Sequence, residues 1–203
     1  MAKDCGNHED YKRRLLYRRL FAAFLVLLIL ALFVIFIVWL VLRPTKPKFY
    51  LQDASLLQFN LTPGDGAVLT TVLQVTVSSR NTNHRIGVYY DRLDAYLFYN
   101  SQRISDVTAL PTGYQDHNDF IVWSPFLSGV AVPITPNLVE AVSQDQNAGH
   151  LLLSLRLDGR VRWKVGTWIS NRYHLQVNCP AYLTVDDGGA FQFDQISACT
   201  VDV

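Results

Sequence analysis

The sequence predicts a mainly β protein: an antiparallel β-sandwich of the immunoglobulin or fibronectin III kind, preceded by a single transmembrane α-helix. Three observations support this prediction. An uninterrupted apolar run lies near the N-terminus, at residues 20–42. At least seven short segments of alternating apolar and polar residues follow it, and clusters of Gly, Pro, Asn and Asp separate them.

The apolar run LFAAFLVLLILALFVIFIVWLVL contains no charged residue, Gly, Pro or amide. As a helix it would be about 34 Å long, enough to cross a hydrocarbon core of about 30 Å. A buried helix of a soluble domain usually keeps a polar edge, and this run has none. It is also too long for a cleavable signal peptide, and Arg43-Pro44-Thr45 follows it without a small-residue cleavage site. We therefore expect a retained anchor whose partner is the lipid bilayer.

The charges around the span predict its orientation. Residues 1–19 form a basic tail with six Lys and Arg, against three between residues 43 and 48. This excess places the N-terminus in the cytosol and the C-terminal domain outside the cell or in the secretory lumen. Cys5 in the tail sits in no specific acylation motif, so an unmodified thiol is the expected state.

Residues 43–48, RPTKPK, contain two prolines and predict a stiff, extended spacer. Residues 49–203 are long enough for one β domain with a single core. Residues 43–203 have 12 Lys and Arg against 14 Asp and Glu, so no nucleic-acid partner is expected. Cys179 and Cys199 both fall on the predicted outer side. An oxidising compartment favours a disulfide between them, which closes a loop of about 20 residues and is worth about 3 kcal/mol; two buried free thiols are the alternative.

The clearest alternation lies in the second half of the domain. Residues 150–158 and 160–165 each place apolar side chains on one face and polar ones on the other. Asp158-Gly159 joins the two runs and predicts a tight hairpin. Residues 136–147 look helical, with Pro136 at the start and Gly149 just beyond the end. Earlier in the domain, alternation predicts a strand with one apolar face formed by Leu69, Leu73, Val75 and Val77.

Several motifs then point to a known family. Residues 81–91 read NTNHRIGVYYD, residues 162–168 read RWKVGTW, and residues 59–62 read FNLT. Together with the late cysteine pair, this set resembles the plant harpin-induced-like proteins. These are relatives of the non-race-specific disease resistance protein and carry a group-2 late embryogenesis abundant domain. The signature residues are Asn81, Asn83, Arg85, Ile86, Gly87, Tyr89, Tyr90 and Asp91.

The resemblance covers essentially the whole chain, and the order of tail, span, spacer and β domain also agrees. It implies a non-enzymatic plant protein of the plasma membrane, and of plasmodesmata, that acts in defence or stress response. Thr82 stands where the family usually has Pro, which leaves the turn in place but less stiff.

The sequence shows no motif for catalysis. It has no G-x-S-x-G, H-E-x-x-H, phosphate-binding Gly loop or C-x-x-C, and its histidines are scattered. Asp186-Asp187 lacks the further oxygen ligands of a calcium loop, so we expect no metal or cofactor. A hydrolase that uses the loop of Asp116, His117 and Asp119 is an alternative without a nucleophile to support it.

Two surface features suggest modification or binding. Asn60-Leu61-Thr62 is an N-glycosylation sequon. A basic row occupies the outer face of the predicted hairpin, and it is either a docking patch for anionic lipid or an acidic protein, or a solvated sheet face. Its members are Arg156, Arg160, Arg162 and Lys164.

The row makes a lipid-binding or membrane-tethering module the main alternative function. A protein partner and a homo-oligomer are left open. A set of aromatic residues presents rings on both faces of its strands and is expected to serve mostly in packing. This set comprises Tyr89, Tyr90, Tyr96, Phe98 and Tyr99.

Overall fold

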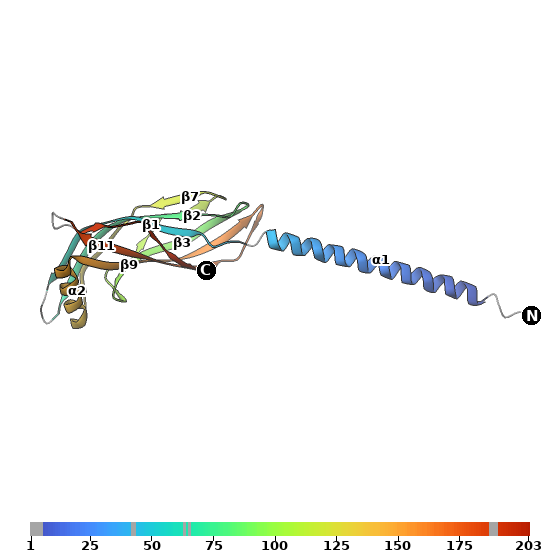
Figure 1. Cartoon of the computed structure of the whole chain (residues 1–203), viewed down its shortest axis with the longest axis horizontal. Helices are drawn as coiled ribbons and strands as arrows, with labels where there is room; N and C mark the ends of the chain where they lie inside the picture. The colour runs from blue at the N-terminus through green and yellow to red at the C-terminus, as the bar shows by residue number, and fades with distance from the viewer. Residues whose placement is uncertain (1–5, 42–43, 63, 65, 187–190) are drawn as a thin grey trace, which may run out of the picture. The chain divides into compact units, whose positions relative to one another are not determined.

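The computed structural model describes residues 6–41, 44–62, 64, 66–186 and 191–203. The chain divides into two compact units, Met1–Arg43 and Pro44–Val203. Figure 1 shows a helical first unit and a β-rich second unit. Four positions covered by the predictions above lie outside the described residues: Cys5, Leu42, Arg43 and Asp187.

The first unit contains helix α1, which spans Gly6–Val41. Within the described residues, its segment Arg13–Ile37 is the stretch long and apolar enough to cross a membrane, and none of it is buried inside the protein. This fits the expected membrane anchor. The helix begins at Gly6, well before residue 20, so most of the predicted basic tail is helical.

The second unit is built from two antiparallel sheets. The first sheet has the order β13-β1-β2-β7, with β8 also paired to β2. Its long strands are β1 (Lys48–Thr62) and β2 (Val68–Arg80). The shorter ones are β7 (Phe120–Trp123), β8 (Phe126–Pro133) and β13 (Ser197–Ala198).

The second sheet has the order β12-β11-β9-β3-β4. Its long strands are β3 (Ile86–Tyr99), β9 (His150–Val165) and β11 (Tyr173–Val185). Strand β3 also pairs with β5 and β6, β9 with β10, and β11 with β14. The short strands are β4 (Gln102–Arg103), β5 (Thr108–Ala109), β6 (Gly113–Gln115), β10 (Trp168–Ile169), β12 (Phe191–Phe193) and β14 (Thr200–Asp202). The mainly β, antiparallel, sandwich-like prediction is confirmed, while a specific immunoglobulin or fibronectin III kinship stays a prediction.

The predicted helix after residue 135 is also present. Helix α2 spans Pro136–Ala148, with Pro136 in its first turn, and Gly149 ends it with a φ of 72°. Leu138 and Val142 bury its apolar side in the core. Figure 1 shows α2 at the end of the domain opposite to the one where the chain enters it.

The core fills the space between the two sheets. Every second side chain of β2, β9 and β11 is buried there, including the predicted set Leu69, Leu73, Val75 and Val77. An aromatic cluster links both sheets at one end: the Tyr90 ring lies edge-on to Trp123 at 5.6 Å and to Phe49 at 6.4 Å. Tyr90 and Tyr99 are buried, whereas Tyr89, Tyr96 and Phe98 lie on the outer face of the second sheet. The rings therefore do occupy both faces of β3.

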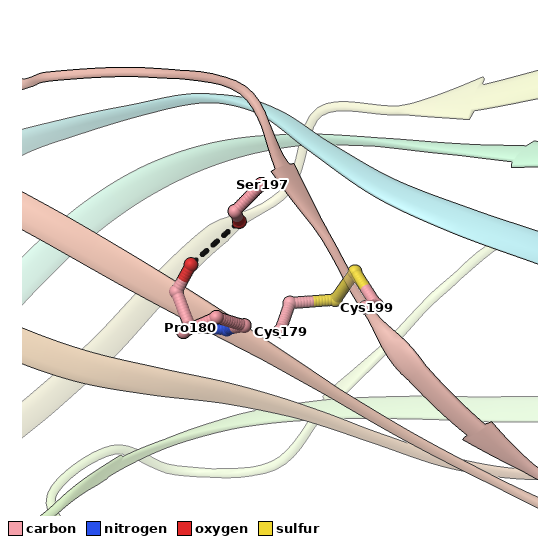
Figure 2. Close-up of a disulfide and its surroundings, with 4 residues drawn as sticks. All are labelled: Cys179, Pro180, Ser197 and Cys199. Atoms are coloured by element: carbon pink, nitrogen blue, oxygen red, sulfur yellow. Dashed lines mark hydrogen bonds between the residues drawn. A yellow bond between two sulfur atoms is a disulfide. The ribbon is translucent and has the colours of Figure 1, made fainter.

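The C-terminal segment crosses from one sheet to the other. Ser197 and Ala198 pair with β1 in the first sheet, and residues 200–202 pair with β11 in the second. Cys199 lies between these pairings and forms a disulfide with Cys179 of β11 (Figure 2). The Ser197 hydroxyl donates a hydrogen bond to the Pro180 carbonyl at 2.6 Å. The disulfide therefore joins the two sheets where the chain passes between them.

The expected hairpin at Asp158-Gly159 is wrong. Strand β9 continues through both residues, and Gly159 pairs with Leu93 on one side and Leu175 on the other. The register shifts between Tyr90 and Arg92 in β3, and this irregularity brings the Arg92 carbonyl against Gly159. Here Gly marks a close approach of two backbones, one of the roles it has inside strands. The reversal falls instead at Gly166-Thr167, between β9 and β10.

We predict that Gly159→Ala destabilises the domain. Its Cβ would clash with the Arg92 carbonyl oxygen, which cannot rotate away, so the sheet must shift. The free energy of unfolding should fall by about 1–3 kcal/mol. Urea titration of the full-length chain in detergent, followed by tryptophan fluorescence, measures this change. Gly113→Ala is the matched control because the space around that Cβ is open; an equal loss in both variants would contradict the interpretation.

Candidate functional site

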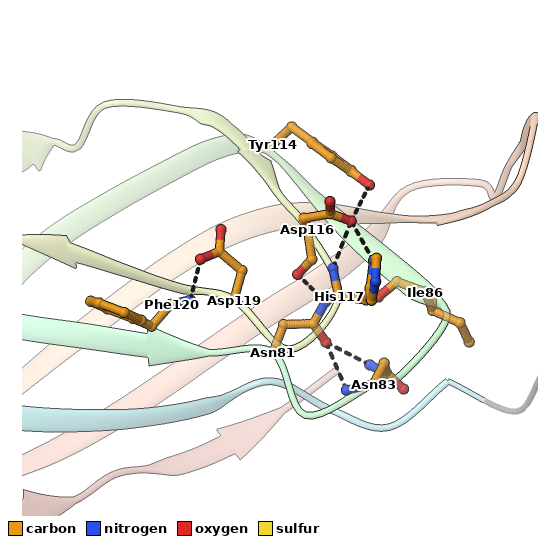
Figure 3. Close-up of polar contacts among 8 residues, drawn as sticks. All are labelled: Asn81, Asn83, Ile86, Tyr114, Asp116, His117, Asp119 and Phe120. Carbon is orange, nitrogen blue, oxygen red and sulfur yellow. Dashed lines mark hydrogen bonds and ion pairs between the residues drawn. The ribbon is translucent and has the colours of Figure 1, made fainter.

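The first signature residues, Asn81 and Asn83, form a buried polar turn between β2 and β3. Asn81 is fully buried, and its side-chain amide donates to the carbonyls of Ile86 at 2.7 Å and Asp116 at 2.9 Å. Its side-chain oxygen accepts from the Asn83 backbone N–H at 3.1 Å and from the Asn83 amide at 2.9 Å (Figure 3). This is the local pattern by which Asn side chains stabilise turns. All polar atoms of Asn81 are therefore used within the protein.

Asn83 extends this turn to the spacer. Its amide donates to the Thr45 carbonyl at 2.9 Å, and its oxygen accepts from the Thr45 N–H at 2.8 Å and hydroxyl at 2.8 Å. The Thr82 hydroxyl lies 3.4 Å from the Thr45 hydroxyl, a contact that Pro at this position could not make. Asn83 thus pairs with both backbone groups of Thr45, much as a neighbouring strand would.

The described spacer is therefore attached to the domain. Pro47 is buried, and Lys46 forms an ion pair with Asp202 at 3.4 Å. The predicted spacer, residues 43–48, contacts the domain from Thr45 onward, and the partners of Thr45 and Lys46 come from distant parts of the sequence. Proline content predicted its extended backbone but carried no information about those partners.

The Asp116–Asp119 loop belongs to the same turn. The Asp116 carboxylate accepts from the His117 N–H at 2.8 Å and ring at 2.7 Å and from the Tyr114 hydroxyl at 3.2 Å. The backbone hydrogen bond from His117 is the main cause that lowers the pKa of Asp116. The Asp119 carboxylate accepts from the Phe120 N–H at 2.8 Å. Both carboxylates bind their own neighbours, as Figure 3 shows, which gives the loop a structural role.

A second feature is an ion-pair cluster on the outer face of the second sheet. Asp91 accepts two bonds from the Arg162 Nε, at 2.8 and 3.0 Å, and one from its Nη2 at 2.5 Å. The Nε of Arg172 donates a further bond at 3.0 Å. The hydrogen bonds from Arg162 are the largest cause that lowers the pKa of Asp91. Asp91 and Arg162, both in motifs that carry the family resemblance, are therefore bound to each other.

The basic row lies on one face of β9, and most of its members contact side chains of the same sheet. The Arg156 guanidinium lies 4.1 Å from the centre of the Phe98 ring, and Lys164 lies 4.8 Å from that of Tyr114. Such cation–π contacts use part of the charge within the protein. Tyr114 can reach this position because it lies directly over Gly87, where any side chain would clash with its ring. Arg160 is exposed, and a docking role for the row stays a prediction.

Two grooves lie on the surface of the domain. One of about 320 Å³ lies on the outer face of the second sheet and is lined by Tyr96, Arg156 and Asn178, among others. Another of about 350 Å³ lies beside the spacer, lined by Pro47, Phe49 and Val201, among others.

In the part of the chain that the structure describes, no group of three or more His, Cys, Asp and Glu side chains could hold a metal ion. Asn60 is exposed on β1, opposite Thr70.

Comparison with known proteins defines the class to which this fold and turn belong. Residues 76–179 match the family model described as late embryogenesis abundant protein, LEA_2. The match covers the signature turn, the ion-pair cluster around Asp91 and Arg162, and the first cysteine of the disulfide. A solved protein from Archaeoglobus fulgidus matches with a TM-score of 0.32 at 9% identity, over 67% of this chain and 98% of that one; so weak a likeness carries no argument.

Full-length relatives narrow the class. NDR1/HIN1-like protein 1 of Arabidopsis thaliana is 43% identical over 99% of this chain and 100% of its own length. NDR1/HIN1-like protein 12 of the same plant is 44% identical over 99% of both chains, and protein 26 is 35% identical over 88% of this chain and 84% of its own. The chain belongs to the NDR1/HIN1-like family, with a LEA_2 domain.

We predict that Asn83→Ala releases the spacer. The variant removes three hydrogen bonds to Thr45 and leaves backbone groups without partners, which should lower the free energy of unfolding by about 2 kcal/mol. Hydrogen–deuterium exchange at residues 44–48 should rise in the full-length protein. Thr82→Ala is the matched control and should change stability by less than about 0.5 kcal/mol. Unchanged exchange in Asn83→Ala would show that Thr45 is held by other contacts.

We predict an acid-sensitive contribution from Asp91. Because the folded pKa is lowered below the ordinary value near 3.8, its stabilisation is present above about pH 4 and is lost as the pH falls through the folded pKa. Asp91→Asn should lower the free energy of unfolding by about 1–2 kcal/mol at pH 7 and by much less near pH 2. Urea titrations at several pH values test this. Asp53→Asn, at an exposed carboxylate, should follow the wild-type profile; a pH-independent loss in Asp91→Asn would refute the electrostatic origin.

Proposed function

We propose that this protein is a single-pass membrane protein whose β domain faces the cell exterior. Its N-terminus then lies in the cytosol. The observation that carries the proposal is the exposed apolar segment Arg13–Ile37, which fits a membrane anchor and is followed by a separate compact domain. The disulfide between Cys179 and Cys199 supports an oxidising compartment for that domain. The basic residues before the span support the same orientation.

We further propose a non-enzymatic role in plant defence or stress response at the plasma membrane, including plasmodesmata. The names of the relatives and of the family model support defence and stress. A non-enzymatic role is supported because the carboxylates of the Asp116–Asp119 loop accept hydrogen bonds from their own neighbours in a turn. If the loop were instead a hydrolase site, activity would be lost in Asp116→Ala and Asp119→Ala. The partner would be a protein or an anionic lipid, and self-association is compatible with the domain.

Lipid binding is the second candidate. The groove of about 350 Å³ beside the spacer has mainly apolar neighbours, including Pro47, Phe49 and Val201, and favours this function. The inner faces of the sheets are occupied by core side chains, so a ligand would bind on the surface rather than between the sheets. Native mass spectrometry of the detergent-purified protein tests this. A consistent added mass of one lipid supports the idea, and unmodified protein in every preparation refutes it.

We predict that Asn60 carries an N-linked glycan. The residue is exposed on β1, and the proposed orientation places it in the lumen where glycans are transferred. The full-length protein in plant membranes should migrate faster after glycosidase treatment, and Asn60→Gln should already migrate at the faster position. Asn100→Gln, outside any sequon, is the control.

Protease protection distinguishes an unused sequon from a wrong orientation. In sealed vesicles with the secretory lumen inside, the β domain should be protected until detergent is added. Digestion of the domain in intact vesicles would place it in the cytosol and overturn the orientation.

A further inference from the structure

The hairpin between β9 and β10 exposes an unusual amount of apolar surface. Trp168 is 63% exposed, whereas Trp123 and Trp163 are buried at 6% and 5%. Ile169 is exposed beside it, and Tyr173, four residues after the end of the short strand, is exposed as well. Large apolar side chains at the tip of a hairpin lie outside the core, so they do not stabilise the fold by burial. Such a group commonly marks a contact with a partner or a membrane.

This hairpin lies at the end of the domain where the chain enters. Val165, the last residue of β9, pairs with Ile86 at the start of β3. Asn83, three residues before Ile86, binds Thr45. Phe120 is at the same end, because Asp119 next to it accepts a hydrogen bond from the Asn81 N–H, and it is 68% exposed. Exposed apolar side chains from three separate segments therefore surround the entry point.

Basic residues lie beside these apolar side chains. Lys164 pairs with Ile169 across the hairpin, and Arg172 lies between Ile169 and Tyr173 in the chain. Aromatic and basic side chains are enriched together at membrane interfaces. The remaining exposed charged and titratable groups at this end include both signs: Lys46, His84, Arg85, Asp116, His117, Asp119 and Asp202. The mixture suits zwitterionic headgroups as well as anionic ones.

The length of the chain restricts what this end can meet. Only Leu42, Arg43 and Pro44 separate the last residue of α1, Val41, from Thr45. Even fully extended, this connection spans about 14 Å. A polar headgroup layer extends about 5–8 Å beyond the hydrocarbon core on each side. If α1 spans the bilayer, the entry end of the domain must therefore stay near the headgroups.

We propose that Trp168, Ile169 and Phe120 insert into the headgroup region of the same bilayer that holds α1. This surface, which we call the entry-end contact, gives the domain a second attachment to the membrane. Together with the Asn83–Thr45 bonds, it would limit the rotation of the domain about the spacer. The inference rests on the proposed membrane anchor, and the test separates the two.

The test follows the fluorescence of Trp168 in vesicles of phosphatidylcholine, with and without brominated acyl chains. The full-length protein carries Trp39→Phe, because Trp39 lies in the apolar run and would be quenched by the span itself. Bromine should remove the fluorescence component of exposed Trp168, and this loss should be absent when Trp168→Phe is added. Buried Trp123 and Trp163 provide the unquenched remainder.

A matched control places an equally exposed tryptophan away from the entry end. Val130 is 74% exposed on β8, which leads toward α2 at the other end of the domain. Val130→Trp in the Trp39→Phe, Trp168→Phe background should show no quenching. Phe120→Trp in the same background should be quenched, because it lies in the entry-end contact.

The outcomes are distinct. If the protein does not float with the vesicles, the membrane anchor itself fails. If it floats and Trp168 is unquenched, the entry-end contact is wrong while the anchor stands, and the hairpin is then available to a protein partner. Equal quenching at Val130→Trp and Trp168 would also overturn the inference, because the domain would then contact lipid without a preferred end.

Discussion

The hydrogen bonds of Asn81 and Asn83 are the interactions on which the arrangement of the domain's entry end depends. Asn81 is fully buried and connects the end of β2, the start of β3 and the loop before β7. Asn83 adds the spacer through Thr45. A buried amide is costly unless its donors and acceptor are all satisfied, and here they are. Replacing either residue would therefore disturb several segments at once.

The two sheets are held together by different means at successive levels. The apolar inner faces supply the core, and the Phe49, Tyr90 and Trp123 rings connect β1, β3 and β7 at the entry end. The C-terminal segment then pairs with both sheets, and the Cys179–Cys199 bond makes that crossing covalent. A cross-link of this kind limits the freedom of the unfolded chain. It also keeps the segment next to Lys46 and Phe49, beside the spacer.

The outer face of the second sheet shows how charge is accommodated on an exposed strand. Arg162, Lys164 and Arg156 lie on one face of β9, where repulsion between neighbours would be unfavourable. Asp91 binds Arg162, and the Phe98, Tyr89 and Tyr114 rings lie under the cations. These three members of the basic row therefore have compensating partners within their own sheet. The exposed Trp168, Ile169 and Phe120 lie outside this row, at the entry end.

The sequence by itself predicted the long apolar helix, the mainly β class, helix α2 and the inward faces of β2 and β9, because these follow from apolar length and period. The family motifs also identified the correct turn. The features that depend on long-range contacts were decided only by the tertiary structure. Gly159 was predicted to be a turn residue, but it lies within β9. A glycine fits there because the Arg92 carbonyl of β3 comes too close for a side chain. Likewise Thr45 finds Asn83, and Arg162 finds Asp91, across 38 and 71 residues. Local patterns contain no information about partners so distant in the chain.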